Sequence, residues 1–186
     1  MNIPNFLTSL RIFLIPVLIV IYYLPWEGRY YASAAIFGIA AITDWLDGFL
    51  ARALNQSTPF GAFFDPVADK VMVSVALIIL VAAYDNPLMT LASAVIVGRE
   101  IVISALREWM AEMGKRASVA VSFVGKFKTT MQMIAIFILL SNAPGTGWAD
   151  FGLFVLIIAA LLTLWSMYIY LKAAWPELSA SKSNNS

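Results

Sequence analysis

The chain has 186 residues, of which 61% are hydrophobic and 12% are charged, and its formal net charge is +1. A soluble domain of this length could not bury so much apolar surface, and the small net charge predicts no nucleic-acid partner. The sequence contains no cysteine and no histidine, which excludes disulfides, imidazole-bound zinc and Ser-His-Asp catalysis.

Six stretches are long and apolar enough to cross a membrane as helices, which takes about 20 residues each. In chain order they are 5–24, 30–54, 61–83, 88–113, 119–141 and 150–173. Only short polar or turn-forming segments separate them, so there is no room for a second domain. We therefore predict an all-α, polytopic membrane protein: a bundle of six transmembrane helices in residues 1–175 and a polar, disordered tail in 176–186.

The distribution of basic residues predicts the orientation of this bundle. If the N-terminus lies inside, the three outer connections hold one basic residue, Arg29, and most of the others lie in inner connections or at inner helix ends. Lysine and arginine are enriched on the cytoplasmic side of membrane proteins. Both termini are therefore expected in the cytoplasm.

Four aspartates stand where the second and third stretches meet at the predicted inner face. Asp44 and Asp47 are one helical turn apart on the second stretch, and Asp65 and Asp69 are one turn apart on the third. Each charge in the membrane costs roughly 3 kcal/mol, and two Mg²⁺ or Mn²⁺ ions would balance four carboxylates with the hard oxygen ligands that these metals prefer. Two such ions can clamp a diphosphate.

Small and basic residues accompany the aspartates on the same helix sides. Gly48 and Ala51 carry little or no side chain, so a nucleotide could lie close to the helix there. Arg52 can form paired hydrogen bonds to phosphate oxygens. In the alternative interpretation, the aspartates cap helix ends or pair with Arg52 and Lys70.

The pattern Asp-x2-Asp-Gly-x2-Ala-Arg-x8-Gly-x3-Asp-x3-Asp resembles the motif of the CDP-alcohol phosphotransferases, and residues 44–69 match all eight of its specified positions. Eight fixed positions at fixed spacing make this a specific motif. The resemblance, to the bacterial branch of the family that acts on glycerol phosphate, extends over nearly the whole chain, including Asn2–Thr8, Gly98–Ile101, Ser104–Glu112 and Gly125–Thr130.

The resemblance implies a fold, a reaction and a set of site residues. It implies transfer of the phosphatidyl group from CDP-diacylglycerol to sn-glycerol 3-phosphate, with release of CMP, in the bacterial inner membrane with the active site facing the cytoplasm. It also favours a homodimer. Asp69 would take the proton from the acceptor hydroxyl as the general base. The implied metal ligands are Asp44, Asp47, Asp65 and Asp69, and the implied CDP-binding residues are Gly48, Ala51, Arg52 and Gly61.

The phosphate of such an acceptor needs cationic residues of its own. Arg99 lies near the middle of the fourth stretch, where an isolated guanidinium would be costly. Alternatively, Arg99 pairs with Glu100, Arg107 reaches the surface, and the lysines of the fifth stretch bind lipid headgroups. The polar stripe on the first stretch could equally belong to an interfacial helix. The candidates for binding this phosphate are Arg99, Arg107, Lys126, Lys128, Thr8 and Arg11.

Three other functions remain open from the residues. A membrane transporter also uses charged residues within the bilayer, although the sequence has no internal repeat of the kind found in many transporters. A structural membrane subunit would have no use for clustered aspartates. A related enzyme with the same donor would use serine, inositol phosphate or phosphatidylglycerol as the acceptor.

Overall fold

The computed structural model describes the backbone of residues 3–53, 59–112 and 123–180, and the side chains of residues 7–44, 61, 63–112, 127–172 and 175. Within these residues the chain forms six α-helices and no strand, which confirms the all-α class. The helices are α1 (Ile3–Tyr23), α2 (Arg29–Ala53), α3 (Pro59–Tyr84), α4 (Pro87–Glu112), α5 (Phe123–Ser141) and α6 (Gly147–Ala180).

Each predicted stretch overlaps one observed helix, and the largest difference is at the C-terminal end. The sequence predicts a disordered tail from residue 176, whereas α6 continues to Ala180. The segment Glu177–Ala180 contains glutamate, leucine and alanine, which favour helical backbone, so the polar character of the tail was a poor guide to the end of α6. Residues 181–186 of the predicted tail lie outside the described residues.

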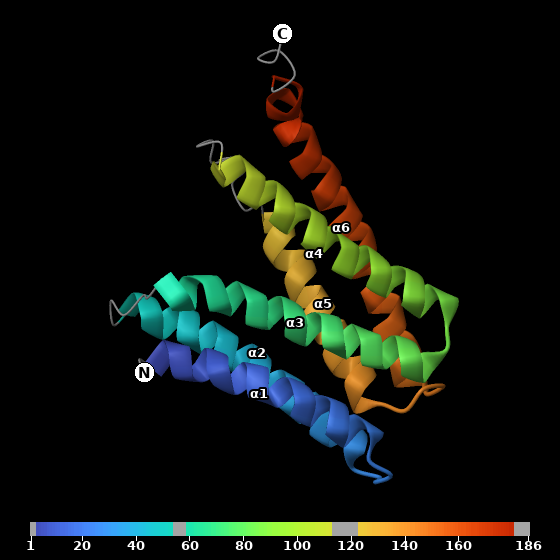
Figure 1. Ribbon diagram of the computed structural model, residues 1–186. Coiled ribbons are helices and arrows are strands. Elements are labelled where there is room, and N and C mark those ends of the chain that lie inside the picture. Colours follow the sequence, from blue (N-terminus) through green and yellow to red (C-terminus); the bar gives the residue numbers. More distant parts are fainter. Residues whose placement is uncertain (1–2, 54–58, 113–122, 181–186) are drawn as a thin grey trace.

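The helices pack around an apolar core that extends through the bundle. Helix α1 packs against α2 and α3, α6 packs against α4 and α5, and α5 also contacts α2 and α3. Figure 1 shows α1, α2 and α3 running side by side, with α4 above α3 and with α5 and α6 running obliquely to them. The most buried core side chains include Leu18, Phe37, Leu77, Leu80, Leu139 and Leu156.

The outside of the bundle is also apolar, as expected for a protein in lipid. Among the described residues, three helical segments are long and apolar enough to cross a membrane: Phe63–Tyr84, Pro87–Glu112 and Gly147–Lys172. Two shorter apolar segments, Leu7–Tyr23 and Phe127–Ser141, accompany them. Large apolar side chains such as Phe13 and Ile78 are mostly exposed on the bundle surface. These features indicate a membrane protein.

A tight connection between α3 and α4 positions the two helices that carry much of the site. Asp85 has a φ of 43°, in the left-handed region that reverses the chain. The side-chain oxygen of Asn86 then accepts a 2.8 Å hydrogen bond from the backbone N–H of Leu88, and Pro87 occupies the first helical position. The reversal brings the middle of α4 back alongside α3, so that both helices line the same cavity.

Candidate active site

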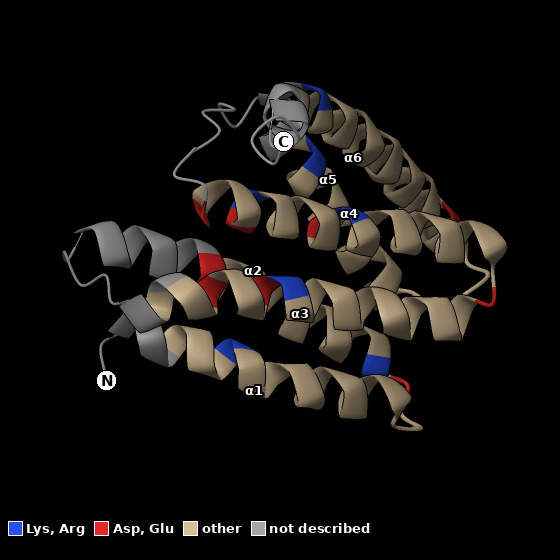
Figure 2. Cartoon of the chain, turned by 45° about the horizontal axis from the view of Figure 1, so that its top comes forward, with Lys and Arg blue, Asp and Glu red and all other residues tan. Residues whose placement is uncertain are grey.

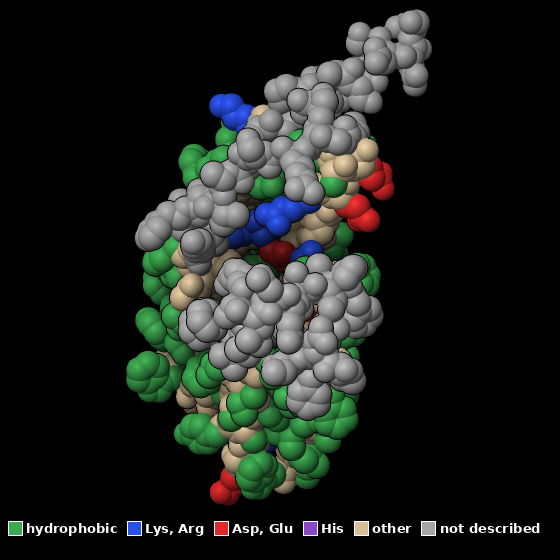
Figure 3. Space-filling view, turned by 90° about the vertical axis from the view of Figure 1, so that its left-hand side faces the viewer, with side chains coloured by type: hydrophobic (Ala, Val, Ile, Leu, Met, Phe, Trp, Pro, Cys, Tyr) green, Lys and Arg blue, Asp and Glu red, His purple; other side chains and the backbone are tan. Residues whose placement is uncertain are grey.

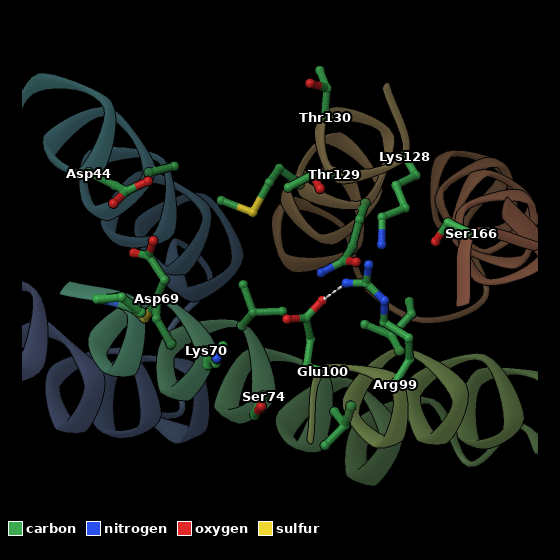
Figure 4. Close-up of a pocket in the computed structure, with 18 of the residues that line it drawn as sticks. Asp44, Asp69, Lys70, Ser74, Arg99, Glu100, Lys128, Thr129, Thr130 and Ser166 are labelled. Atoms are coloured by element: carbon green, nitrogen blue, oxygen red, sulfur yellow. Dashed lines mark hydrogen bonds and ion pairs between the residues drawn. The ribbon is translucent and has the colours of Figure 1, made fainter. Parts of the chain in front are cut away.

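A cavity of about 870 Å³ lies between the helices and is lined by residues from α1 to α6. Its charged side chains form two groups. Asp44 and Asp69 lie on one side of the cavity, and Arg99, Glu100 and Lys128 lie on the other (Figure 4). We call these the aspartate end and the cationic end. Arg11 and Lys70 belong to the aspartate end, and Arg107 belongs to the cationic end.

The charged residues of the cavity are concentrated within one part of the bundle. Figure 2 shows acidic and basic positions close together on α1, α2 and α3, in the half of these helices nearer the N-terminus of the chain. A space-filling view of that side of the molecule shows acidic and basic side chains recessed in a hollow (Figure 3). Charged side chains of the described residues therefore cluster toward one end of α1, α2 and α3.

Arg11 joins two of the aspartates at the aspartate end. Its Nη1 atom lies 2.5 Å from Oδ1 of Asp69 and 3.1 Å from Oδ1 of Asp44. The side chain of Arg11 is only 1% exposed, so its charge requires close counter-charges. Because Asp44 is on α2 and Asp69 is on α3, these two ion pairs hold both helices to α1.

A second contact extends the connection between α1 and α3. The hydroxyl of Thr8 donates a hydrogen bond to Oδ1 of Asp65. Thr8 and Arg11 are three residues apart on α1, and Asp65 and Asp69 are four apart on α3, so each pair occupies one face of its helix. The polar stripe predicted on the first stretch therefore contacts the aspartates through Thr8 and Arg11.

The carboxylates of the aspartate end are the candidate ligands for a divalent cation. Asp44, Asp65 and Asp69 do not form a group of three carboxylates close enough to hold a metal ion, and the side chain of Asp47 is outside the described residues. However, Asp44 and Asp69 converge on one cationic nitrogen and keep 42% and 41% of their side chains exposed. One arginine balances one of the two negative charges, and carboxylate oxygens are the ligand type that a hard divalent ion prefers.

Several predicted site residues fall where the side chains are not described. The helical backbone of α2 includes Gly48, Ala51 and Arg52. The surroundings of Gly48 and the side chains of Ala51, Arg52 and Lys126 lie outside the described residues. Gly61 is described and is buried, one turn before Asp65 on α3. The predicted nucleotide-binding residues therefore lie on the two helices that carry the aspartates.

The cationic end contains a buried lysine next to an arginine that is only 12% exposed. Arg99 forms an ion pair with Glu100, as the alternative interpretation anticipated, yet its buried Nε atom has no hydrogen-bond partner among the described residues. Lys128 is 4% exposed, and its side chain points toward Arg99 (Figure 4). A lysine this deeply buried does not fit the alternative in which Lys128 reaches lipid headgroups.

Arg107 lies at the edge of the cationic end and is held by α6. Its Nε atom donates a 3.2 Å hydrogen bond to the hydroxyl of Tyr170, and its guanidinium carbon lies 5.4 Å from the centre of the Tyr170 ring. The sequence did not single out Tyr170, Ser166 or Gln132 as lining the cavity. Of these three residues, only Gln132 could have been predicted to line the cavity, because it is one helical turn after Lys128 on the same helix face.

The comparison with protein families decides the class of this site. The model of the CDP-alcohol phosphatidyltransferase family matches residues 1–166, which is most of the chain and includes both ends of the cavity. The chain belongs to the CDP-alcohol phosphatidyltransferase family. The resemblance predicted from the motif is thereby confirmed, and the protein is a phosphatidyltransferase.

Relatives within the CDP-alcohol phosphatidyltransferase family are similar over nearly their full length. The chain is 57% identical over 180 residues to a protein of Pseudomonas fluorescens, which covers 96% of this chain and 92% of the relative. It is 56% identical to a protein of Salmonella choleraesuis (strain SC-B67) and 53% identical to one of Escherichia coli (strain K12), each over 95% of this chain and 97% of the relative. All three are named CDP-diacylglycerol–glycerol-3-phosphate 3-phosphatidyltransferase.

Proposed function

We propose that the protein transfers the phosphatidyl group from CDP-diacylglycerol to sn-glycerol 3-phosphate, giving phosphatidylglycerophosphate and CMP. The observation that carries this proposal is the pairing of an aspartate end and a cationic end in one cavity. The diphosphate of the donor needs metal-binding carboxylates, as at the aspartate end, and the phosphate of the acceptor needs positive charge, as at the cationic end. The names of the relatives, at 53–57% identity, favour the same substrate pair over other acceptor alcohols and over a transporter.

The aspartate end would hold two divalent ions, Mg²⁺ or Mn²⁺. The ligands would be Asp44, Asp47, Asp65 and Asp69, which supply carboxylate oxygens only. When bound, such ions neutralise diphosphate charge and stabilise both the attacking and leaving oxygens. The support for this assignment is the convergence of Asp44 and Asp69 and the exposure of both carboxylates to the cavity.

Asp69 would act as the general base. It lies at the cavity on α3, where the primary hydroxyl of an acceptor could reach it. The carboxylate takes the hydroxyl proton, the resulting oxygen forms a bond to the phosphorus that bears diacylglycerol, and the bond from that phosphorus to the bridging oxygen breaks. The electron pair of the broken bond leaves with CMP.

The CDP group would lie along α2 and the start of α3. Gly48 and Ala51 leave space beside the helix, and Arg52 would donate hydrogen bonds to phosphate oxygens. Gly61, which is buried one turn before Asp65, would contribute a surface without a side chain. The diacylglycerol tails would remain in the surrounding lipid, since the helices present apolar side chains on the outside.

The cationic end would bind the phosphate of the acceptor. Arg99, Arg107 and Lys128 supply three positive charges and Glu100 supplies one negative charge, which leaves two positive charges for a phosphate monoester dianion. Lys128 and the Nε atom of Arg99 are the groups best placed to donate hydrogen bonds to the phosphate, because both are buried. In this role Glu100 holds Arg99 in place until the phosphate arrives. Lys126, two residues before Lys128, would add charge near the same site.

The proposed reaction is consistent with a particular placement in the membrane. The donor is a lipid, whereas glycerol 3-phosphate and CMP are soluble in water, so the cavity would open to the cytoplasm at the inner face of the bacterial inner membrane. Six spans with both termini in the cytoplasm satisfy this requirement and the distribution of basic residues. A homodimer is favoured by the family resemblance alone.

The direct test is to identify the lipid product. Purified protein in detergent is incubated with CDP-diacylglycerol and sn-glycerol 3-phosphate, and the lipid fraction is analysed by mass spectrometry. Phosphatidylglycerophosphate and an equal amount of CMP are expected. CMP release without this lipid would indicate hydrolysis or a different acceptor, and would contradict the proposal.

A further inference from the structure

We propose that Arg11 is a resident counter-cation of the aspartate end. It holds Asp44 and Asp69 together when no metal ion is bound, and its charge lowers the affinity of the site for divalent cations. This inference rests on the proposed function in one respect, namely that divalent ions bind to these aspartates. It assigns to α1, which lies outside the eight-position motif, a direct influence on the metal site.

The geometry at Arg11 is that of a cation shared by two anions. A single atom, Nη1, lies within hydrogen-bonding distance of a carboxylate on α2 and of a carboxylate on α3. Two carboxylates facing one another would otherwise repel across the gap between these helices. Arg11 therefore supplies an attraction between α2 and α3 that does not depend on metal.

The exposure of the three side chains differs in an informative way. Arg11 is 1% exposed, whereas Asp44 and Asp69 are 42% and 41% exposed. All three side chains line the cavity, but the guanidinium is buried and the carboxylates keep open surface. An ion that enters the cavity meets two carboxylates whose charge is already partly balanced by Arg11.

The charges determine the direction of the expected effect. Asp44, Asp65 and Asp69 carry three negative charges, and Arg11 and Lys70 carry two positive charges, so the described part of the site presents one net negative charge to an incoming ion. Replacement of Arg11 by a neutral side chain raises this to two. A purely structural arginine would lower stability on removal without raising metal affinity.

The test compares Arg11→Gln with Arg11→Lys and with Arg29→Gln in full-length protein purified in detergent. Lysine keeps the charge of Arg11. Arg29 is a matched charge control, since it lies at the opposite end of α2 and contacts Tyr30, at 2.7 Å from the Tyr30 hydroxyl. Mn²⁺ binding is measured from the paramagnetic resonance signal of the free ion, and thermal unfolding is followed in EDTA.

We expect Arg11→Gln to bind Mn²⁺ more tightly by about tenfold and to unfold at a lower temperature than wild type in EDTA. Saturating Mn²⁺ should remove most of this difference in unfolding temperature. Arg11→Lys should bind Mn²⁺ about as tightly as wild type does, and Arg29→Gln should leave Mn²⁺ affinity unchanged. If Arg11→Gln cannot be isolated without metal, purification in Mg²⁺ followed by displacement with Mn²⁺ gives the same comparison.

Equal or weaker Mn²⁺ binding by Arg11→Gln, with normal binding by wild type, would overturn the inference and leave the proposed metal site intact. The inference would also be overturned if Arg11→Lys gained affinity as much as Arg11→Gln, because charge would then not be the cause. A wild-type protein that bound no Mn²⁺ would contradict the metal site of the proposed function, and the inference with it.

Discussion

The Nζ atom of Lys70 donates a 2.5 Å hydrogen bond to the hydroxyl of Ser104, and that hydroxyl donates a 2.6 Å hydrogen bond to the backbone carbonyl of Glu100. Lys70 directly follows Asp69 on α3, and Glu100 directly follows Arg99 on α4. The two hydrogen bonds therefore connect the aspartate end of the cavity to the cationic end. Of the two, the Lys70–Ser104 bond is the one that joins α3 to α4.

The first prediction concerns this connection. Ser104→Ala removes the acceptor of the Lys70 hydrogen bond, and we expect a loss of about 2 kcal/mol in the free energy of unfolding. The catalytic efficiency kcat/KM for glycerol 3-phosphate should also fall, because the two ends are then less well positioned. Thermal unfolding and steady-state kinetics provide the measurements.

Ser141→Ala is the matched control for this prediction. The hydroxyl of Ser141 bonds to a carbonyl within its own helix, at Ile138, and does not link two helices. The Ser141→Ala variant should leave kcat/KM for glycerol 3-phosphate unchanged. Equal effects of Ser104→Ala and Ser141→Ala on kcat/KM would show that the link between α3 and α4 does not position the substrates.

The second prediction concerns the general base. Asp69→Asn keeps the size of the side chain but cannot take a proton, so kcat for CMP release should fall by about a hundredfold or more. Binding of CDP-diacylglycerol should largely persist, as measured by protection against thermal unfolding. Asp85→Asn, in the connection between α3 and α4, is the control and should leave kcat unchanged. Near-normal turnover by Asp69→Asn would exclude Asp69 as the base.

The third prediction concerns the acceptor phosphate. Arg99→Ala and Lys128→Ala should each raise the KM for glycerol 3-phosphate by about tenfold or more, because each removes a charged hydrogen-bond donor from a buried position. The KM for CDP-diacylglycerol should change much less. Lys172→Ala removes an exposed lysine from α6 and should change neither constant. An unchanged acceptor KM in both variants would place the phosphate elsewhere.

The fourth prediction concerns Glu100, whose carboxylate pairs with Arg99. Glu100→Gln preserves the shape of the side chain and an acceptor oxygen but removes the charge that competes with phosphate. We expect the KM for glycerol 3-phosphate to fall by about threefold, an effect similar in size to that of one screened ion pair. A KM that rises instead would mean that the ion pair is needed to orient Arg99 in the bound state.

The six helices and the placement of the aspartates on helix faces could be predicted from the sequence, because both depend on local spacing. Apolar length gave the six helices, and the turn-to-turn spacing of Asp65 and Asp69 placed them on one face of α3. The same reasoning put Asp44 close to them, since only a short connection separates α2 from α3. The structure brings Asp44 and Asp69 to one nitrogen atom, as this reasoning requires.

The contacts between helices distant in the chain could not be predicted. Periodicity assigned Thr8 and Arg11 to a polar face of α1, but it could not say which helix that face would meet, so their bonds to the aspartates came only from the structure. The burial of Lys128 depends in the same way on how α5 packs against its neighbours. From the sequence alone, a lysine at the start of an apolar helix is equally compatible with a buried and with a surface position.

The most direct test of the account is an assay of CMP release from CDP-diacylglycerol by the purified protein, with a panel of alcohols and with or without EDTA. The account predicts rapid release with sn-glycerol 3-phosphate, little with glycerol, serine or inositol phosphate, loss of activity in EDTA and recovery when Mg²⁺ or Mn²⁺ is added in excess. Full activity in EDTA, or equal activity with glycerol and glycerol 3-phosphate, would contradict the assignment of the two ends of the cavity.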